Sequence, residues 1–128
     1  MTTRVTWIAA ACLGLSGVAL GAFGAHALKP MLTANGRVET YELAVRYIMF
    51  HALALFAIGF LHEKFPGVRI RLAGLLLLSG VLVFSGSLLL LALLNWRSMA
   101  FFTPFGGVLM LSGWGLLVYV IATTRKGL

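Results

Sequence analysis

The sequence predicts an all-α integral membrane protein, a four-helix bundle with antiparallel up-and-down topology. Three observations predict this fold class. The 128 residues are 61% hydrophobic and 10% charged, against roughly 45–50% and 25% in soluble proteins. The apolar residues gather in four stretches of about 20 residues, the length that a helix needs to cross a hydrocarbon core of about 30 Å. The charged residues fall at or near the ends of these stretches.

We expect residues 1–128 to form a single domain. Backbone amides in hydrocarbon must bond to one another, so each apolar stretch is expected to be a helix. Because the connections are short, each helix is expected to run antiparallel to its neighbour in the chain. The predicted helices cover residues 5–27, 41–61, 70–94 and 104–123.

Residues that favour turns separate the apolar stretches. Proline disfavours continuation of a helix, and an Asn-Gly pair favours a tight turn. Three such breaks follow the first two helices: Lys29-Pro30, Asn35-Gly36 and residues 65–67 (Phe-Pro-Gly). Thr103 is expected to cap the fourth helix, with Pro104 at its first helical position.

Lysine and arginine residues predict the orientation in the membrane. The face that holds both termini and the second loop carries Arg4, Lys64, Arg69, Arg71, Arg125 and Lys126. The opposite face carries Lys29, Arg37, Arg46 and Arg97. Because cytoplasmic loops are enriched in lysine and arginine, we expect both termini in the cytoplasm.

The first apolar stretch has an alternative interpretation. Arg4, the apolar run and the sequence Ala25-His26-Ala27 imitate a secretory signal peptide with its cleavage site. The run is longer than the roughly 7–15 apolar residues of a signal peptide, and it carries several glycines suited to helix packing. We therefore expect a retained first helix.

Small residues predict where the helices pack, since helices in lipid associate through close contact rather than through the hydrophobic effect. On the first helix they lie within about 100° of one another at 3.6 residues per turn: Ala10, Gly14, Gly17, Gly21 and Gly24. On the third and fourth helices the small residues are Ala73, Ser79, Gly80, Gly86, Ser87, Gly106 and Gly113. We expect these surfaces to hold the bundle together, and a contact with a second subunit is compatible with this.

Polar residues inside a span are functional candidates because they are costly in lipid. Glu42 and Arg46 have the i, i+4 spacing of an ion pair at the outer end of the second helix. The alternative is an anion or lipid-head-group site that uses Arg46.

His51 lies about ten residues, or roughly 15 Å, inside the second predicted helix. A neutral histidine at this depth needs partners for its ring nitrogens. We expect His51 to join helices through hydrogen bonds, and ligand contact or a proton relay is the alternative. The expected partners are Ser79, Ser85, Ser87 or the Tyr47 hydroxyl.

Motifs for catalysis and metal binding are missing from the sequence. Aspartate is absent, and no glutamate is placed deep in the membrane to orient a histidine. His62 begins the stretch HEKFP, which lacks the second histidine of a zinc-protease helix. We expect no enzyme, no cofactor and no metal site. Haem between His26 and His51 is a weaker alternative, because their expected depths differ by about 10 Å.

Four stretches resemble, in order, the motifs of a known family. They are residues 21–28 (GAFGAHAL), Tyr47 with residues 51–55 (HALAL), residues 84–88 (FSGSL), and residues 103–107 (TPFGG) leading to Gly113-Trp114. These motifs are similar to those of the YgdD-like family of small membrane proteins (domain of unknown function 423), which includes eukaryotic transmembrane protein 256. One departure is Leu89, where the family often carries tyrosine.

The resemblance implies a retained first helix and a location in the bacterial inner membrane. It implies no activity, because the family is itself largely uncharacterised. It does single out the polar residues that match the family's motif positions: His26, Tyr47, His51, Ser85, Ser87 and Thr103.

Three functional hypotheses follow. The first is a non-enzymatic bundle that binds lipid or serves as a structural or accessory component of a membrane complex. The second is a small oligomeric transporter or channel with His51 as the proton-coupling residue, since the deepest carboxylate, Glu42, lies near an interface. The third is a haem-binding redox subunit.

The expected partners are the lipid bilayer and either a second copy of the chain or a larger membrane complex. Nucleic acid is not expected. The net charge of +7 is distributed over the helix ends and forms no basic helix or basic-aromatic patch.

Overall fold

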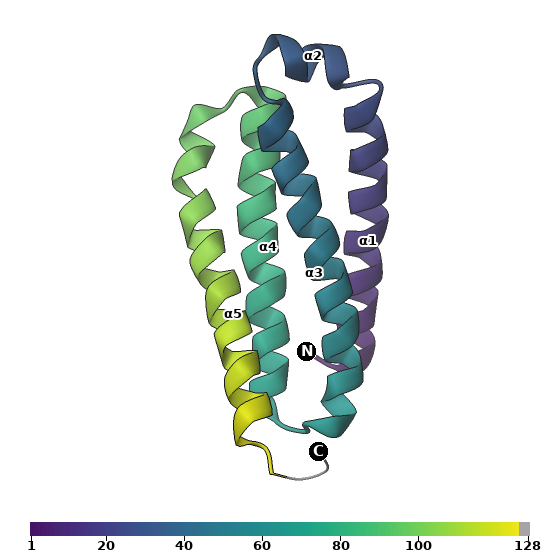
Figure 1. Cartoon of the computed structure of the whole chain (residues 1–128), viewed down its shortest axis with the longest axis vertical. Coiled ribbons are helices and arrows are strands. Elements are labelled where there is room, and N and C mark those ends of the chain that lie inside the picture. The colour runs from purple at the N-terminus through teal and green to yellow at the C-terminus, as the bar shows by residue number, and fades with distance from the viewer. Residues whose placement is uncertain (126–128) are drawn as a thin grey trace.

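A computed structural model of the protein describes residues 1–125. In this part of the chain, four helical segments are long and apolar enough to cross a membrane, which confirms the predicted all-α membrane fold (Figure 1). Lys126, counted above among the basic residues, lies outside the described residues. The elements are α1 (Thr3–Ala25), α2 (Lys29–Ala34), α3 (Val38–Lys64), α4 (Val68–Leu94), the 3-10 helix η1 (Arg97–Phe101) and α5 (Thr103–Thr123).

The helices have two distinct ends. The connecting helices α2 and η1 lie at one end, which we call the α2 end (Figure 1). The start of α1, the α3–α4 connection and the last turn of α5 lie at the other, which we call the terminal end.

The connection between α1 and α3 differs from the prediction. α1 ends at Ala25 rather than at residue 27, because His26 leaves the helical region with φ −123° and ψ −83°. Pro30 does not simply end the first helix; it lies in the first turn of α2, where its missing N–H is tolerated. The predicted turn at Asn35-Gly36 is present, with Gly36 at φ +64°, a value that glycine adopts readily.

The predicted cap of the last helix is wrong. Phe102 occupies the cap position of α5, and no side-chain hydrogen bond caps this helix. The Thr103 hydroxyl instead lies 2.7 Å from the Ser87 hydroxyl of α4. Pro104 lies in the first turn, as predicted. A bond to a neighbouring helix satisfies the threonine hydroxyl as well as a cap does, and it also joins two helices.

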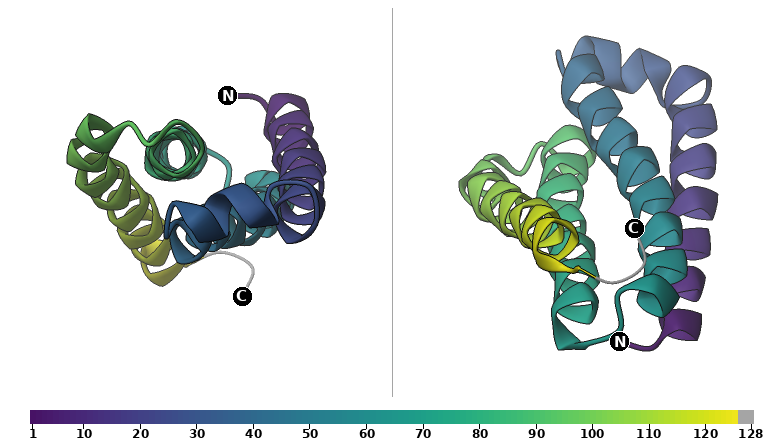
Figure 2. Two further views of the ribbon diagram at one scale, coloured as in Figure 1. Left: turned by 90° about the horizontal axis from the view of Figure 1, so that it is seen from above. Right: turned by 60° about the horizontal axis from the view of Figure 1, so that its bottom comes forward.

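The long helices are arranged in a row in which each packs mainly on its neighbour. α1 packs on α3, α3 on α4, and α4 on α5. Figure 2 shows α1 and α5 at opposite sides of the molecule. The two central helices supply most of the fully buried core, including Leu55, Ile58 and Leu77. The outer helices bury a smaller share of their residues, so much of α1 and α5 faces lipid.

α1 packs on α3 through a seam of small residues. The buried residues are Thr6, Ala10, Leu13, Gly17 and Gly24, and this alternation of three and four is typical of helices that cross at a shallow angle. A side chain at Gly24 would collide with the Tyr41 ring. Gly21 approaches only Val45. At Gly14, and likewise at Gly86 of α4, an added Cβ would meet no other described segment within 4 Å.

α4 and α5 approach each other backbone to backbone. A Cβ added at Gly80 would lie 2.7 Å from the Met110 nitrogen and 3.0 Å from the Gly106 carbonyl oxygen. A Cβ added at Gly113 would lie 3.1 Å from the Ala73 carbonyl oxygen. Glycines on both helices therefore set the position of α5 on α4, and this position fixes one wall of the site described next.

Candidate functional site

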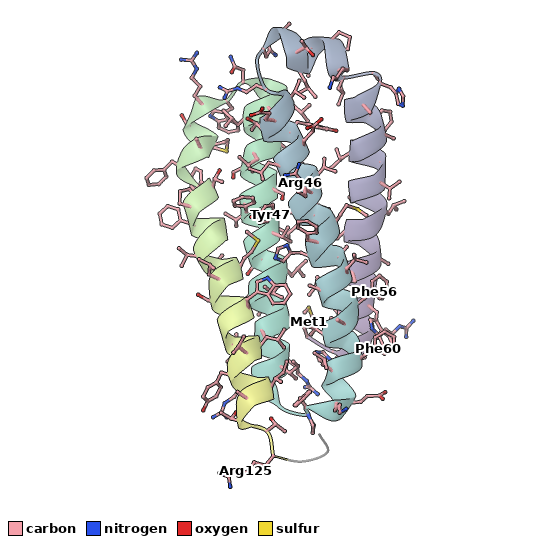
Figure 3. The ribbon with its side chains drawn as sticks, in the orientation of Figure 1. Met1, Arg46, Tyr47, Phe56, Phe60 and Arg125 are labelled. Atoms are coloured by element: carbon pink, nitrogen blue, oxygen red, sulfur yellow. The ribbon has the colours of Figure 1, made fainter. Side chains whose placement is uncertain are left out.

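A cleft of about 370 Å³ lies between α3, α4 and α5. His51 stands at the midpoint of α3, so the cleft lies near the middle of the spanning helices. Figure 3 shows the labelled Tyr47 side chain between α3 and α4. The residues that line the cleft are Tyr47, His51, Phe84, Gly107, Met110, Leu111 and Trp114.

His51 forms one side of this cleft, and both of its ring nitrogens are hydrogen-bonded. Nδ1 lies 2.9 Å from the Tyr47 carbonyl oxygen, and Nε2 lies 3.3 Å from the indole nitrogen of Trp114. An indole N–H can only donate, so Nε2 accepts, and the hydrogen bonds assign the ring proton to Nδ1. His51 is only 4% exposed. The neutral ring is therefore buried with both polar atoms satisfied.

The partners of His51 differ from those predicted. Neither the serines of α4 nor the Tyr47 hydroxyl bonds to the ring, because Ser79 and Ser85 donate to the carbonyl oxygens of Leu75 and Ala44. The missed residue is Trp114. Tryptophans in membrane proteins concentrate at the interfaces. A tryptophan near the middle of a span therefore indicates that its indole N–H bonds to a polar group inside the bundle, and this is the signal from which Trp114 could have been predicted.

Aromatic side chains form the lipid-facing part of the cleft. The Tyr47 ring lies 4.6 Å from that of Phe84 and stacks on His51 at 6.0 Å between centroids. Trp114 is 43% exposed, although its indole nitrogen is bonded to His51. Among the hydrogen bonds of residues 1–125, none involves the Tyr47 hydroxyl. This hydroxyl is therefore free to bond to a molecule that enters the cleft.

The remaining serines and threonine join helices beside the cleft. Ser87 donates to the Phe84 carbonyl, and the Thr103 hydroxyl lies 2.7 Å from Ser87. Ser85 is 1% exposed and donates to the Ala44 carbonyl at 2.8 Å. These three residues hold α3, α4 and α5 in place, and their hydroxyls do not line the cleft.

Glu42 and Arg46 lie elsewhere, along a smaller cavity of about 260 Å³ between α1 and α3. Both side chains are exposed, and the structure shows no ion pair between them. The predicted pair is therefore absent. An exposed i, i+4 pair contributes only about 0.3–0.5 kcal/mol, which is too little to hold two flexible side chains together. Tyr41 borders the same cavity and donates to the Leu20 carbonyl.

His26 does not meet His51. It is exposed at the end of α1, whereas His51 lies 13 residues into α3, about 20 Å from the α2 end at 1.5 Å per residue. Residues 1–125 contain no group of three or more His, Cys, Asp or Glu side chains that could hold a metal ion. The structure therefore brings together Tyr47 and His51 from the predicted site, with Ser85, Ser87 and Thr103 beside them, and leaves His26, Glu42 and Arg46 outside it.

Comparison with known proteins identifies a family of membrane proteins. A family model described as a protein of unknown function (DUF423) matches residues 20–107. The UPF0382 inner membrane protein YgdD of Escherichia coli K12 is 41% identical over 130 residues, which cover 99% of this chain and 97% of the relative. The UPF0382 membrane protein YwdK of Bacillus subtilis is 36% identical over 116 residues, covering 90% and 94%. No solved structure matches the chain.

The spanning helices and the named relatives define a multi-pass protein of the bacterial inner membrane. More particularly, the chain belongs to the DUF423 family, whose members include the UPF0382 membrane proteins named above. The predicted family membership and location are thus confirmed.

Proposed function

We propose that the protein binds a bilayer lipid in the cleft between α3, α4 and α5, and that it catalyses no reaction. The Tyr47 hydroxyl carries this proposal. It borders a cleft near the middle of the spanning helices and has no hydrogen-bond partner among the described residues. A hydroxyl in an apolar environment without a partner is unfavourable, and one hydrogen bond contributes about 0.5–1.5 kcal/mol. A lipid that carries a carbonyl oxygen would remove this penalty.

The shape and lining of the cleft support the same ligand class. Its volume of about 370 Å³ falls within the roughly 300–1,000 Å³ of ligand pockets. Phe84, Met110 and Leu111 supply an apolar surface for an acyl or prenyl chain, and Gly107 leaves open space beside them.

The same geometry disfavours the transporter hypothesis based on His51. Proton coupling requires a group that gains and loses a proton freely. A proton on Nε2 of His51 would face the indole N–H of Trp114, so two donors would oppose each other. Glu42 lines a different cavity, so it cannot take part in proton coupling with His51. The haem hypothesis requires two histidines to meet at one iron, and His26 and His51 lie on different parts of the molecule.

The proposal can be tested by identifying what co-purifies with the full chain. Native mass spectrometry of the gently extracted protein should show a retained lipid. Gly107 lines the cleft, and a Cβ added there meets no other segment within 4 Å, so we expect Gly107→Leu to occupy the cleft and lose that lipid while the fold persists. Gly115→Leu, two turns further along α5, is the matched control because Gly115 is also open but does not line the cleft.

Tyr47→Phe tests the hydroxyl itself. It keeps the ring against Phe84 and removes one hydrogen bond, so we expect roughly 2- to 12-fold weaker retention. Wild-type protein that retains no lipid, or a Gly107→Leu variant that retains as much as the wild type, would overturn the proposal. A protein that instead co-purifies in stoichiometric amount would favour the accessory-subunit hypothesis.

A further inference from the structure

A second cavity, of about 470 Å³, lies at the terminal end of the molecule. It is bounded by the α3–α4 connection on one side and by the end of α5 on the other. Lys64, Arg69 and Arg125 contribute to its lining, and no acidic side chain does. Figure 3 labels Arg125 at this end, far from Tyr47. The cavity is therefore separate from the cleft discussed above.

The three cations at this cavity have no acidic partner in the described chain. Glu63 precedes Lys64, yet no ion pair joins any acidic and basic groups among residues 1–125. The Arg69 guanidinium lies 5.4 Å from the centroid of the Tyr119 ring, which supports its position without neutralising its charge. Like charges around one cavity repel each other, and an anion between them would relieve this repulsion.

The backbone of the cavity also favours an anion. Gly67 and Val68 line the cavity where α4 begins, and no side-chain hydrogen bond caps this helix. The first N–H groups of a helix lack partners within it and carry partial positive charge. Gly67 has φ +143°, a conformation suited to glycine, so the turn presents its backbone without a side chain in the way.

The position of the cavity indicates where the anion comes from. A helix of 27 residues such as α3 is about 40 Å long, against a hydrocarbon core of about 30 Å. The helix ends therefore extend roughly 5 Å into the head-group layer on each side, where lipid phosphates lie. Ile70 and Val120 line the same cavity and provide an apolar contact for the glycerol and upper acyl region of a lipid.

We propose that this cavity binds the phosphate of an anionic phospholipid, with Lys64, Arg69 and Arg125 around the phosphate and the start of α4 below it. The ligand chemistry is a phosphate group, which a soluble phosphate could also supply. This site does not depend on the proposed lipid site at Tyr47, and the two can fail independently.

The test uses the full chain, reconstituted with phosphatidylglycerol or with the zwitterionic phosphatidylcholine. Native mass spectrometry should show preferential retention of phosphatidylglycerol. The variant Lys64→Gln/Arg69→Gln/Arg125→Gln should retain it roughly 10- to 100-fold less, and added salt should weaken the wild-type preference. The matched control, Lys29→Gln/Arg46→Gln/Arg97→Gln, removes three exposed cations from the half of the molecule nearer the α2 end and should keep the preference.

Each outcome of this experiment bears on the proposal. Equal loss in both triple variants would show a general charge effect and overturn the site. Thermal stabilisation of the wild type by inorganic phosphate, without preference for phosphatidylglycerol, would assign the cavity to a soluble phosphate and overturn the lipid source. If the triple variant fails to fold, the single variant Arg125→Gln replaces it, because Arg125 follows the end of α5. Because no charged side chain lines the cleft at Tyr47, Gly107→Leu should leave the preference for phosphatidylglycerol over phosphatidylcholine intact, which separates this site from the cleft.

Discussion

The indole N–H of Trp114 donates to Nε2 of His51 across 3.3 Å, and this bond joins α5 to α3. These two helices are not main packing neighbours, since α5 packs chiefly on α4. The bond therefore holds together α3 and α5, the two walls of the cleft that do not pack closely on each other. It also occupies Nε2, the ring nitrogen of His51 that faces α5.

The bond between Trp114 and His51 should be detectable as an energetic coupling. We expect Trp114→Phe and His51→Phe each to lower the free energy of unfolding, because each leaves a polar group unpaired in lipid. In the double variant the losses should not add, with a coupling of about 0.5–2 kcal/mol. Unfolding in mixed micelles with sodium dodecyl sulfate measures all four proteins. Strict additivity would mean that the bond is not formed in the membrane.

The close approach of α4 and α5 predicts a strong effect of a single methyl group. Gly106→Ala places a Cβ 2.8 Å from the Gly80 carbonyl oxygen and 2.7 Å from the Phe84 Cα atom, and backbone cannot move aside cheaply. We expect a loss of about 1–3 kcal/mol in unfolding free energy. Gly107→Ala is the control, since an added Cβ there meets no other segment within 4 Å, and helix propensity should stabilise it by up to about 1 kcal/mol. Equal effects of the two changes would contradict the packing.

Two serines of α4 offer a matched pair for the interhelical hydrogen bonds. Ser85 donates to the Ala44 carbonyl of α3, whereas Ser79 donates to the Leu75 carbonyl of its own helix. We expect Ser85→Ala to lower the unfolding free energy by about 0.5–1.5 kcal/mol. Ser79→Ala should change it little, because the lost bond does not join two helices. The same unfolding titration decides between this result and equal effects at both positions.

Much of the fold was predictable because lipid imposes simple rules. Length and hydropathy identify the four spanning helices, and short connections set their antiparallel order. The sequence prediction lacks the six-residue helix α2 because Lys29-Pro30 is typical of a break, although proline also favours the first turn of a helix. Local sequence does not distinguish these two roles.

The candidate site was predictable only in part. Depth along a helix follows from counting residues, so Tyr47, His51 and the serines could be placed at comparable levels. Which side chains meet depends on the rotation of each helix, and the glycine contacts of α4 with α5 set that rotation. Trp114 lies 63 residues from His51 in the chain, so no local pattern links them. The predicted ion pair between Glu42 and Arg46 is wrong for a different reason. Their spacing along the helix permits an ion pair, but two exposed side chains gain too little free energy to stay paired.

The orientation of the bundle gives the last prediction. The start of α1 and the last turn of α5 lie at the end that holds Arg4, Lys64, Arg69 and Arg71, and the positive-inside rule predicts that this end is cytoplasmic. In a Cys12→Ser background, a cysteine at Thr33, which is exposed at the α2 end, should react with a membrane-impermeant maleimide in intact spheroplasts. A cysteine at Glu63, exposed at the terminal end, should react only after lysis.

Because the two faces differ by only two basic residues in the sequence, six against four, adding lysines at the α2 end should weaken this difference in labelling. The reverse labelling pattern in the unmodified charge background would place the basic cavity on the periplasmic side.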